Sequence, residues 1–539
     1  MNVILQTNGL LGAELARLLL RILTQASRDP NSATAGSFDR DWWHYRIRDF
    51  SSAILQQGAW TAFLAAEHPA FAADRAALTQ LAAAGARFWN KRAVRHGAFE
   101  EYYPWERGYP VAAFSARAVL KLLEAGVVPA DDVRAGVAVA AEQLLARFEA
   151  EAANQQVAGL AALALIRKFY PEFVPAAELA AQAARTLALQ HDEGWFMEYG
   201  GPDLAYLSVT LDALWDLMDV TGESRYRDAA ARALRFLNAQ VGVLGASAGM
   251  LNARNTDYIL PYGIVRFLKD GTAEEQGQAA WLFATLYGNL DSPDHFLHAV
   301  DDRYLCHYTG HSLLRAWSLV RQLDAAALPA PVAPPLGERL FAGAGQWLRR
   351  GGVDELSALL ALKKGGVFSA RLGEKYCADF GWIVRSGATQ FVTHWWGGDW
   401  AWRQVADGGW NITGHLVPHR ETISTPLKHF VLRTASLLLG EKLAPWLKSV
   451  LIFKQRQSPL AFERSLRFAG RRIVVRDEIR GLRPNMEILP APRASKRHVS
   501  SADSFHREDL ALARGVKVER DARREGAAFR AETIFSFED

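Results

Sequence analysis

Six clusters of polar and aromatic residues recur in the first 311 residues, and each leads into an apolar helical stretch. Tyrosine can transfer protons, arginine and asparagine can hold a carboxylate, and aromatic rings can stack on sugars. Helix N-termini also favour anionic ligands. One cluster could be a local helix cap, but six in phase predict a binding rim. The candidates are His44, Arg48, Tyr103, Trp105, Glu106, Arg107, Asn154, Gln156, Tyr206, Arg254, Asn255, Tyr258, His307 and His311.

The most crowded cluster is "FEEYYPWERGYP", residues 99–110. We expect Tyr103 and Trp105 to stack on a sugar and Arg107 to pair with its acidic group, while Glu106 or its neighbour Glu101 orients that arginine. The two remaining tyrosines of the segment are expected to point inward as a structural staple between helices.

The elements that must position these clusters follow from their spacing. The clusters recur about every fifty residues, which is typical of a repeat architecture. The stretch after each cluster is apolar nearly all round, as a buried helix should be, whereas the runs between them carry one polar face. Six inner helices that alternate with outer ones predict a complete or incomplete α/α toroid over residues 1–325, with all clusters at one end.

The remainder of the chain predicts a different class of structure. A Pro- and Ala-rich connector with a helix is expected over residues 326–365. From residue 366 to 539, short β-branched and aromatic runs between turn residues, among them 429–440 and 449–457, predict an antiparallel sheet or sandwich, so the whole is an α+β multidomain protein. The tryptophans of "WWGGDWAW", residues 395–402, could pack on the toroid or stack on a sugar, which adds Trp396, His394 and His415 to the binding candidates.

Composition excludes several classes of function. A formal net charge of +4 over 539 residues indicates no nucleic-acid partner, and two cysteines indicate no disulfide framework. No Gly-rich phosphate loop or nucleotide-binding fingerprint is present, so no cofactor is expected.

His307 and His311 share one helix face without an acidic partner, so no metal is expected there, and a structural divalent metal in the β-domain has no motif support. Without an export signal or membrane span, the protein is expected to be cytoplasmic.

The order of toroid and β-domain resembles the heparinase II/III-like and alginate-lyase-like polysaccharide lyases. In these lyases an inner helix begins with an Asn-Asn-His type signature, and here "AANQQVAG" places Asn154 at an asparagine and Gln156 at the histidine. A second signature carries the catalytic tyrosine, which matches Tyr206 in "GPDLAYLS" with Leu207 in place of the neighbouring histidine. The β-domain motif His-Gly-His-Ala-Asp is missing, and His394 and His415 lie in its closest substitutes.

The resemblance implies β-elimination at a uronic acid of an acidic poly- or oligosaccharide. Asn154 and Gln156 would hold the carboxylate with Arg107 or Arg254, and Tyr206 would transfer protons. Glutamine cannot titrate, so the base would be His307 or His311 instead, or Tyr206 would act alone. Three alternatives remain open: a uronate C5-epimerase, a glycoside hydrolase of uronides with a carboxylate pair such as Glu101–Glu106 or Asp203–Glu198, and a non-catalytic glycan-binding protein of the same fold.

Overall fold

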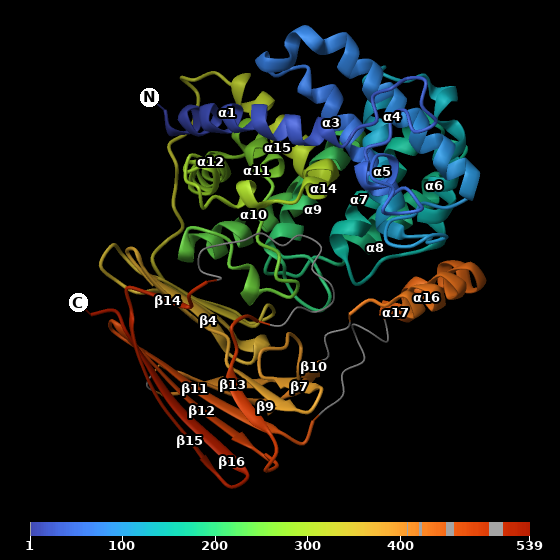
Figure 1. Ribbon diagram of the computed structural model, residues 1–539. Helices are drawn as coiled ribbons and strands as arrows, with labels where there is room; N and C mark the ends of the chain where they lie inside the picture. Colours follow the sequence, from blue (N-terminus) through green and yellow to red (C-terminus); the bar gives the residue numbers. More distant parts are fainter. Residues whose placement is uncertain (1, 407, 420–422, 449–457, 495–509, 539) are drawn as a thin grey trace.

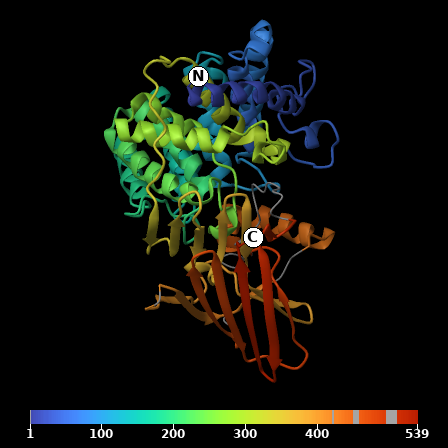
Figure 2. The same ribbon diagram turned by 90° about the vertical axis from the view of Figure 1, so that its left-hand side faces the viewer.

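The computed structural model describes residues 2–406, 408–419, 423–448, 458–494 and 510–538. A helical domain occupies the N-terminal part of the chain, and layers of antiparallel sheet lie beneath it in the view of Figure 1. Figure 2, turned by 90°, shows the same two parts one above the other. The expected α+β organisation, a helical toroid followed by a β-domain, is therefore confirmed.

Six inner helices form a closed ring. Each inner helix contacts the next one along the chain, and the last contacts the first. They are nearly all apolar and rich in small residues, which lets their backbones approach closely: a Cβ on Gly159 would lie 2.3 Å from the hydroxyl of Tyr109. The inner helices are α3 (Gln57–Ala65), α5 (Tyr109–Glu124), α7 (Ala153–Phe169), α9 (Leu204–Thr221), α11 (Tyr262–Asp270) and α15 (Gly310–Arg321).

Six outer helices each pair with an inner one and bury only one face, as their amphipathic sequences predict. They are α1 (Val3–Thr24), α4 (Arg75–His96), α6 (Arg134–Ala146), α8 (Ala176–Leu187), α10 (Ser224–Leu244) and α12 (Ala273–Tyr287). Short helices and turns join the pairs: α2 (Arg40–Trp43), η1 (Ala53–Gln56), η2 (Pro69–Asp74), η3 (Ala130–Asp132), η4 (Gly249–Leu251), α13 (Phe296–Ala299), α14 (Asp302–Tyr304) and η5 (Leu305–Thr309).

Among the described residues, α1 is long and apolar enough to cross a membrane by length and composition. In the structure this helix packs against α3, α12 and α15, and Leu11, Leu15 and Leu18 are buried in that contact. The absence of a membrane span stays a prediction.

Three antiparallel sheets form the β-domain. The first contains β1 (Gly337–Phe341), β2 (Gln346–Arg350), β3 (Ser357–Ala361), β4 (Val367–Leu372), β5 (Lys375–Asp379) and β14 (Ala513–Arg514), in that order. The second has the order β10 (Val417–His419), β7 (Thr389–Val392), β6 (Trp382–Ser386) and β13 (Glu487–Pro490). The third has the order β15 (Lys517–Glu525), β16 (Ala528–Ser536), β12 (Arg472–Arg480), β11 (Ala461–Ala469), β9 (Trp410–His415) and β8 (Ala401–Gln404).

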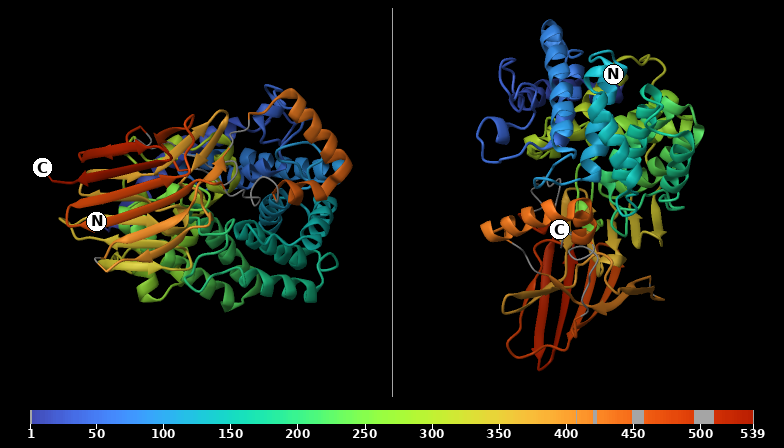
Figure 3. Two further views of the ribbon diagram at one scale, coloured as in Figure 1. Left: turned by 90° about the horizontal axis from the view of Figure 1, so that it is seen from below. Right: turned by 90° about the vertical axis from the view of Figure 1, so that its right-hand side faces the viewer.

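Two stretches differ from their sequence-based expectation. The helix expected in residues 326–365 is wrong, because β1 begins at Gly337 and β2 and β3 follow it. The Ala- and Leu-rich run 357–361 forms β3, which pairs with β2 on one side and β4 on the other. Pairing within the sheet overrides the helix propensity of this run. The strand expected over residues 429–440 is instead α16 (Pro426–Leu439), which Thr425 caps through its side chain; η7 (Gly440–Lys442) and α17 (Leu443–Lys448) follow. Figure 3 shows α16 projecting from the side of the molecule. A strand expected over residues 449–457 lies outside the described residues.

Two hydrophobic cores hold the layers together. The larger fills the toroid and extends onto the first sheet, where the rings of Phe236 in α10 and Phe341 in β1 lie 4.9 Å apart. The smaller lies between the first and third sheets, with Phe368 against Phe535 at 5.5 Å. The first sheet therefore joins both cores and fixes the β-domain against the end of the ring.

Candidate functional site

Tyr206 lies in the first turn of α9, at the N-terminal end of this inner helix. Asp203 is the N-cap residue, and its Oδ1 accepts the backbone N–H of Tyr206 at 3.1 Å. A second loop is fixed to the same carboxylate, because the hydroxyl of Thr256 donates to Oδ1. One buried aspartate therefore joins the start of α9 to the loop that precedes α11, and the helix cap sets the position of Tyr206.

Arg254, from that second loop, lies over two tyrosine rings. Its guanidinium carbon is 4.2 Å from the ring centre of Tyr199 and 5.6 Å from that of Tyr206, within the range of cation–π contact. Tyr206 is 7% exposed and Arg254 is 5% exposed. Burial raises the pKa of the Tyr206 phenol well above its usual value of about 10, and the positive charge of Arg254 acts in the opposite direction. The pair places a fixed cation beside a phenol that can donate or accept a proton.

Asn154 joins this cluster through Glu198. The backbone N–H and the side-chain amide of Asn154, in the first turn of α7, each donate to Oε1 of Glu198 at 2.7 Å. Burial raises the pKa of the Glu198 carboxyl to about 8, against the lowering effects of these hydrogen bonds and of Arg254. Two loops of the toroid thus bring Asn154, Glu198, Arg254 and Tyr206 together, as the sequence predicts for three of these four residues.

A further pair of phenols comes from the last two inner repeats. The hydroxyls of Tyr258 and Tyr308 lie 2.5 Å apart, and the charge of an ionised Tyr308 or Tyr304 would raise the pKa of Tyr206. His307 lies 4.9 Å from the ring of Tyr304, in the short π-helical turn η5, where its own backbone leaves the helical region. Burial and the nearby Arg303 lower the pKa of His307 to about 3. Its imidazole is therefore neutral, and it is too weak a base for efficient proton abstraction near neutral pH.

The segment 99–110 forms a partly exposed wall beside the cluster. Tyr102 is 56% exposed and Trp105 is 42% exposed, and Arg107 is exposed as well. Tyr103 is buried, which leaves Tyr102 and Trp105 as the exposed aromatic rings of the segment. Tyr102 is therefore not the buried staple expected of it, although its hydroxyl hydrogen-bonds to Glu101. Tyr109 points inward as expected.

The two glutamates of this wall have different surroundings. Glu106 is buried, and its Oε2 accepts the backbone N–H groups of Glu101 and Tyr102 at 3.0 and 2.8 Å, so it holds its own loop rather than a substrate. Burial and the charge of Glu106 raise the pKa of Glu101 well above its usual value, with Arg303 and Arg48 acting against them. Glu101 is therefore a buried carboxyl at the edge of the tyrosine cluster whose neutral form is favoured.

Four predicted residues make packing, ion-pair or surface contacts outside the group of Asn154, Glu198, Arg254 and Tyr206. Gln156 is buried between α7 and α8, where Oε1 accepts the N–H of Glu149 at 2.8 Å and Nε2 lies 3.3 Å from acceptors on Gln182 and Thr186. His311 packs inside the ring, 4.3 Å from Trp60. Arg48 pairs with the buried Asp39, and His44 is exposed beside Tyr45, with its ring 4.6 Å away. The substrate roles expected of Gln156 and His311 are wrong for a physical reason: helical periodicity turns both side chains toward neighbouring helices.

The β-domain reaches the cluster through its buried face. The indole of Trp396 donates to the carbonyl of Gly200 at 3.3 Å, and a Cβ on Gly201 would lie 2.1 Å from that ring. Trp396 is therefore a packing residue that supports the loop of Glu198 and Tyr199. Asn255 likewise contacts the β-domain, because its amide nitrogen donates to the carbonyl of Ala494 at 3.1 Å.

The two candidate histidines of the β-domain lie in different places. His394 is buried, and burial together with the charge of Lys364 lowers its pKa to about 3. His415 lies on β9 in the third sheet, where Nδ1 is 2.6 Å from Asp399 and its backbone pairs with Ala461 of β11, so its described contacts are all within the β-domain. The substrate-binding role expected of His415 therefore has no support in this arrangement.

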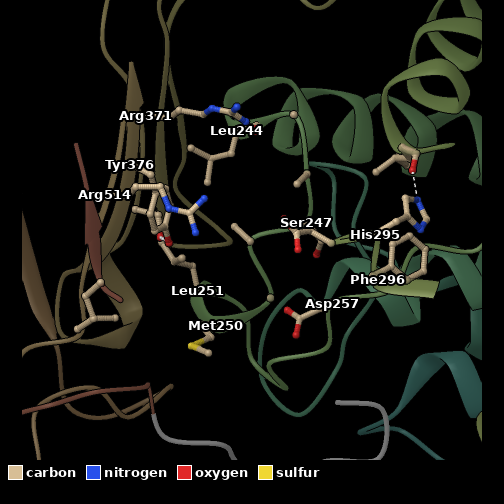
Figure 4. Close-up of a pocket in the computed structure, with 18 of the residues that line it drawn as sticks. Leu244, Ser247, Met250, Leu251, Asp257, His295, Phe296, Arg371, Tyr376 and Arg514 are labelled. Atoms are coloured by element: carbon tan, nitrogen blue, oxygen red, sulfur yellow. Dashed lines mark hydrogen bonds between the residues drawn. The ribbon is translucent and has the colours of Figure 1, made fainter. Parts of the chain in front are cut away.

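A pocket of about 300 Å³ lies at the boundary between the toroid and the first sheet (Figure 4). It is lined by Ser247, Met250 and Asp257 on the toroid side and by Tyr376 and Arg514 on the sheet side. Asp257 belongs to the loop that carries Arg254, but the lining does not include Arg254, Tyr206 or Asn154. Within the described parts of the chain, no three His, Cys, Asp or Glu side chains gather as a metal site would require.

Comparison with solved structures identifies a protein of the same fold. The chondroitin AC lyase of Streptomyces coelicolor A3, in complex with chondroitin sulphate, superposes with a TM-score of 0.57 at 12% identity, over 97% of this chain and 77% of that one. This chain has the fold of that polysaccharide lyase. A heparinase III (10% identity, 98% and 84% covered) and the heparan sulfate lyase of Pedobacter heparinus (11%, 89% and 92%) give TM-scores of 0.41 and 0.20, too low to establish a shared fold. No family model matches the sequence, and no curated protein matches it significantly.

Several residues of this lyase fold escape prediction from the sequence. Tyr199 lies in a turn and Tyr304 ends the three-residue helix α14, and neither segment is long enough to have a periodicity that would place its side chain near Tyr206. Lys364 precedes two glycines in a segment expected to be helical. Glu198 appears in the sequence analysis only as a hydrolase candidate, whereas the structure makes it the link between Asn154 and Arg254.

Proposed function

We propose that the protein catalyses lyase-type β-elimination at a uronic acid of an acidic poly- or oligosaccharide. The observation that carries this proposal is the placement of Arg254 over Tyr206 at the end of a toroid with the fold of a chondroitin AC lyase. The departure from the histidine signature at Gln156 does not count against it, because that side chain is part of the packing between α7 and α8.

The chemistry needs a group that neutralises the uronate carboxylate and a group that moves the C5 proton. Arg254 supplies positive charge for the carboxylate, and Asn154 supplies an amide that could donate to it. The Tyr206 phenolate removes the C5 proton, the C4–O bond breaks as the C4–C5 double bond forms, and the phenol returns its proton to the leaving oxygen. Because burial raises the pKa of Tyr206, the phenolate is a minor species, and the nearby Arg254 makes it more accessible.

The test is an incubation of the protein with uronate-containing glycans, including chondroitin sulphate, while ultraviolet absorbance of the unsaturated product is followed. Tyr206→Phe should lower kcat by at least about a hundredfold, since it removes the group that transfers the proton. The matched control is Tyr170→Phe, which removes another phenol that hydrogen-bonds to the carbonyl of Ala130 beyond the opposite end of α7.

The products separate the alternatives. Solvent deuterium at C5 without chain cleavage would identify an epimerase, and new reducing ends without the chromophore would identify a hydrolase. Full activity of Tyr206→Phe would contradict the assignment of Tyr206 as the proton-transfer group. If the wild type neither binds nor turns over any uronate glycan, the proposed function is wrong.

A further inference from the structure

Lys364, at the end of η6 (Leu362–Lys364) in the β-domain, is fully buried against the toroid. Its ammonium group donates to the carbonyl of Met250 at 2.6 Å, to the carbonyl of Asn252 at 2.8 Å and to Oδ1 of Asn255. An ammonium has three protons, so these three acceptors satisfy it completely. All three belong to one loop of the other domain, residues 249–257, part of which lines the pocket in Figure 4.

This loop carries Arg254, and Asn255 within it has an unusual backbone. Its φ of +58° lies in the left-handed region, which residues other than glycine seldom occupy. The side chain is held at both ends by the β-domain, because Oδ1 accepts from Lys364 and Nδ2 donates to the carbonyl of Ala494. The residue next to the site arginine is therefore fixed in a rare conformation from outside the toroid.

Stability alone does not account for a charge at this position. Burying an ammonium group costs free energy, and its three direct acceptors are neutral oxygens rather than a carboxylate. Burial accordingly lowers the pKa of Lys364 to about 7, although Asp203 and Asp257 act in the opposite direction. An apolar side chain of similar length would avoid this cost, but it would leave the three oxygens of the loop without their donor.

We propose that Lys364 is a positioning residue, which fixes the 249–257 loop so that the Arg254 guanidinium lies over Tyr206. The β-domain thereby completes a site whose reacting groups all come from the toroid. Lys364 acts through Asn255 and through the loop carbonyls of Met250 and Asn252, to which its ammonium group donates. The catalytic consequence rests on the proposed function, whereas the clamping of the loop does not.

The first experiment measures the clamp directly by amide hydrogen exchange. Lys364→Met should speed exchange in the 249–257 loop at least about tenfold and leave the amides of α9 unchanged. The matched control is Lys363→Met, because Lys363 is the adjacent lysine and its ammonium donates instead to the carbonyl of Gly343 at 2.6 Å. Unchanged exchange in the loop of a folded Lys364→Met protein would overturn the proposal. Should that variant not fold, Asn255→Gly keeps the left-handed backbone, removes one acceptor and should show the same loop-specific increase.

The second experiment uses turnover of the uronate glycan. Lys364→Met should lower kcat about 10- to 100-fold with little change in KM, as expected when a reacting group is displaced by about 1 Å. In an Arg254→Lys background the same substitution should have little further effect, because the group that Lys364 positions is already altered. Additive losses would overturn the positioning role. If the wild type is inactive while loop exchange still responds to Lys364→Met, the proposed function fails and the clamp stands.

Discussion

At the scale of single residues, Glu198 is a buried acid whose surroundings favour its neutral form. One oxygen accepts two N–H groups of Asn154, while the other, Oε2, is buried and has no hydrogen-bond partner among the described residues. An ionised carboxylate in this position would bury a negative charge on an oxygen without a hydrogen-bond donor. A carboxylic acid or an amide carries no charge and avoids this cost. This arrangement explains why its pKa rises to about 8.

Glu198→Gln should therefore change how stability depends on pH. In the wild type the unfolded carboxyl ionises near pH 4.5 while the folded one stays protonated to about pH 8, so the free energy of unfolding falls over that interval. The glutamine variant lacks this dependence, and it should be more stable than wild type at pH 8 by roughly 1–3 kcal/mol, with little difference near pH 4. Urea unfolding at a series of pH values measures this difference. Parallel curves for the two proteins would show that Glu198 is ionised in the folded state.

At the scale of elements, the packing of α7 against α8 decides the role of Gln156. Its amide makes hydrogen bonds to the backbone of residue 149 and to side chains of α8, all in a buried contact. Gln156→Ala should therefore cost about 1–3 kcal/mol in the free energy of unfolding and leave kcat of the folded protein unchanged. Thermal unfolding together with turnover at saturating substrate tests this. A loss of kcat with unchanged stability would show that Gln156 takes part in the reaction.

The periodicity of the sequence predicts the ring of helices but not all of its side-chain directions. Continuous apolar runs at fifty-residue spacing are a strong signal, and all six predicted inner helices are present. Asn154 and Gln156 are only two residues apart, yet a helix turns by about 200° between them, so one faces the site and the other faces α8. The loops that bring Arg254 over Tyr199 have no such period, because tertiary contacts between distant segments, such as that of Lys364 with Asn255, fix them.

At the scale of the whole molecule, a buried ion cluster links three inner helices across the interior of the ring. Asp216 of α9 accepts from Arg117 of α5 at 2.7 Å and from Arg315 of α15 at 2.5 Å. Three helices that are distant in the chain are thereby linked within the toroid that supports the site. The two arginines hold the pKa of Asp216 far below its usual range, so its charge is present throughout the neutral range.

Asp216→Asn should destabilise the toroid by about 3–5 kcal/mol, because it leaves two buried guanidinium groups without their anion. The wild-type contribution is present above the unfolded pKa of about 4 and is lost as the pH falls toward the depressed folded pKa, so the gap between the two proteins should narrow in acid. Asp219→Asn on the same helix is the control: its pair with Arg266 is more exposed and should cost less than about 1 kcal/mol. Urea unfolding followed by circular dichroism measures both. Equal losses for the two variants would mean that the ion cluster does not hold the ring together.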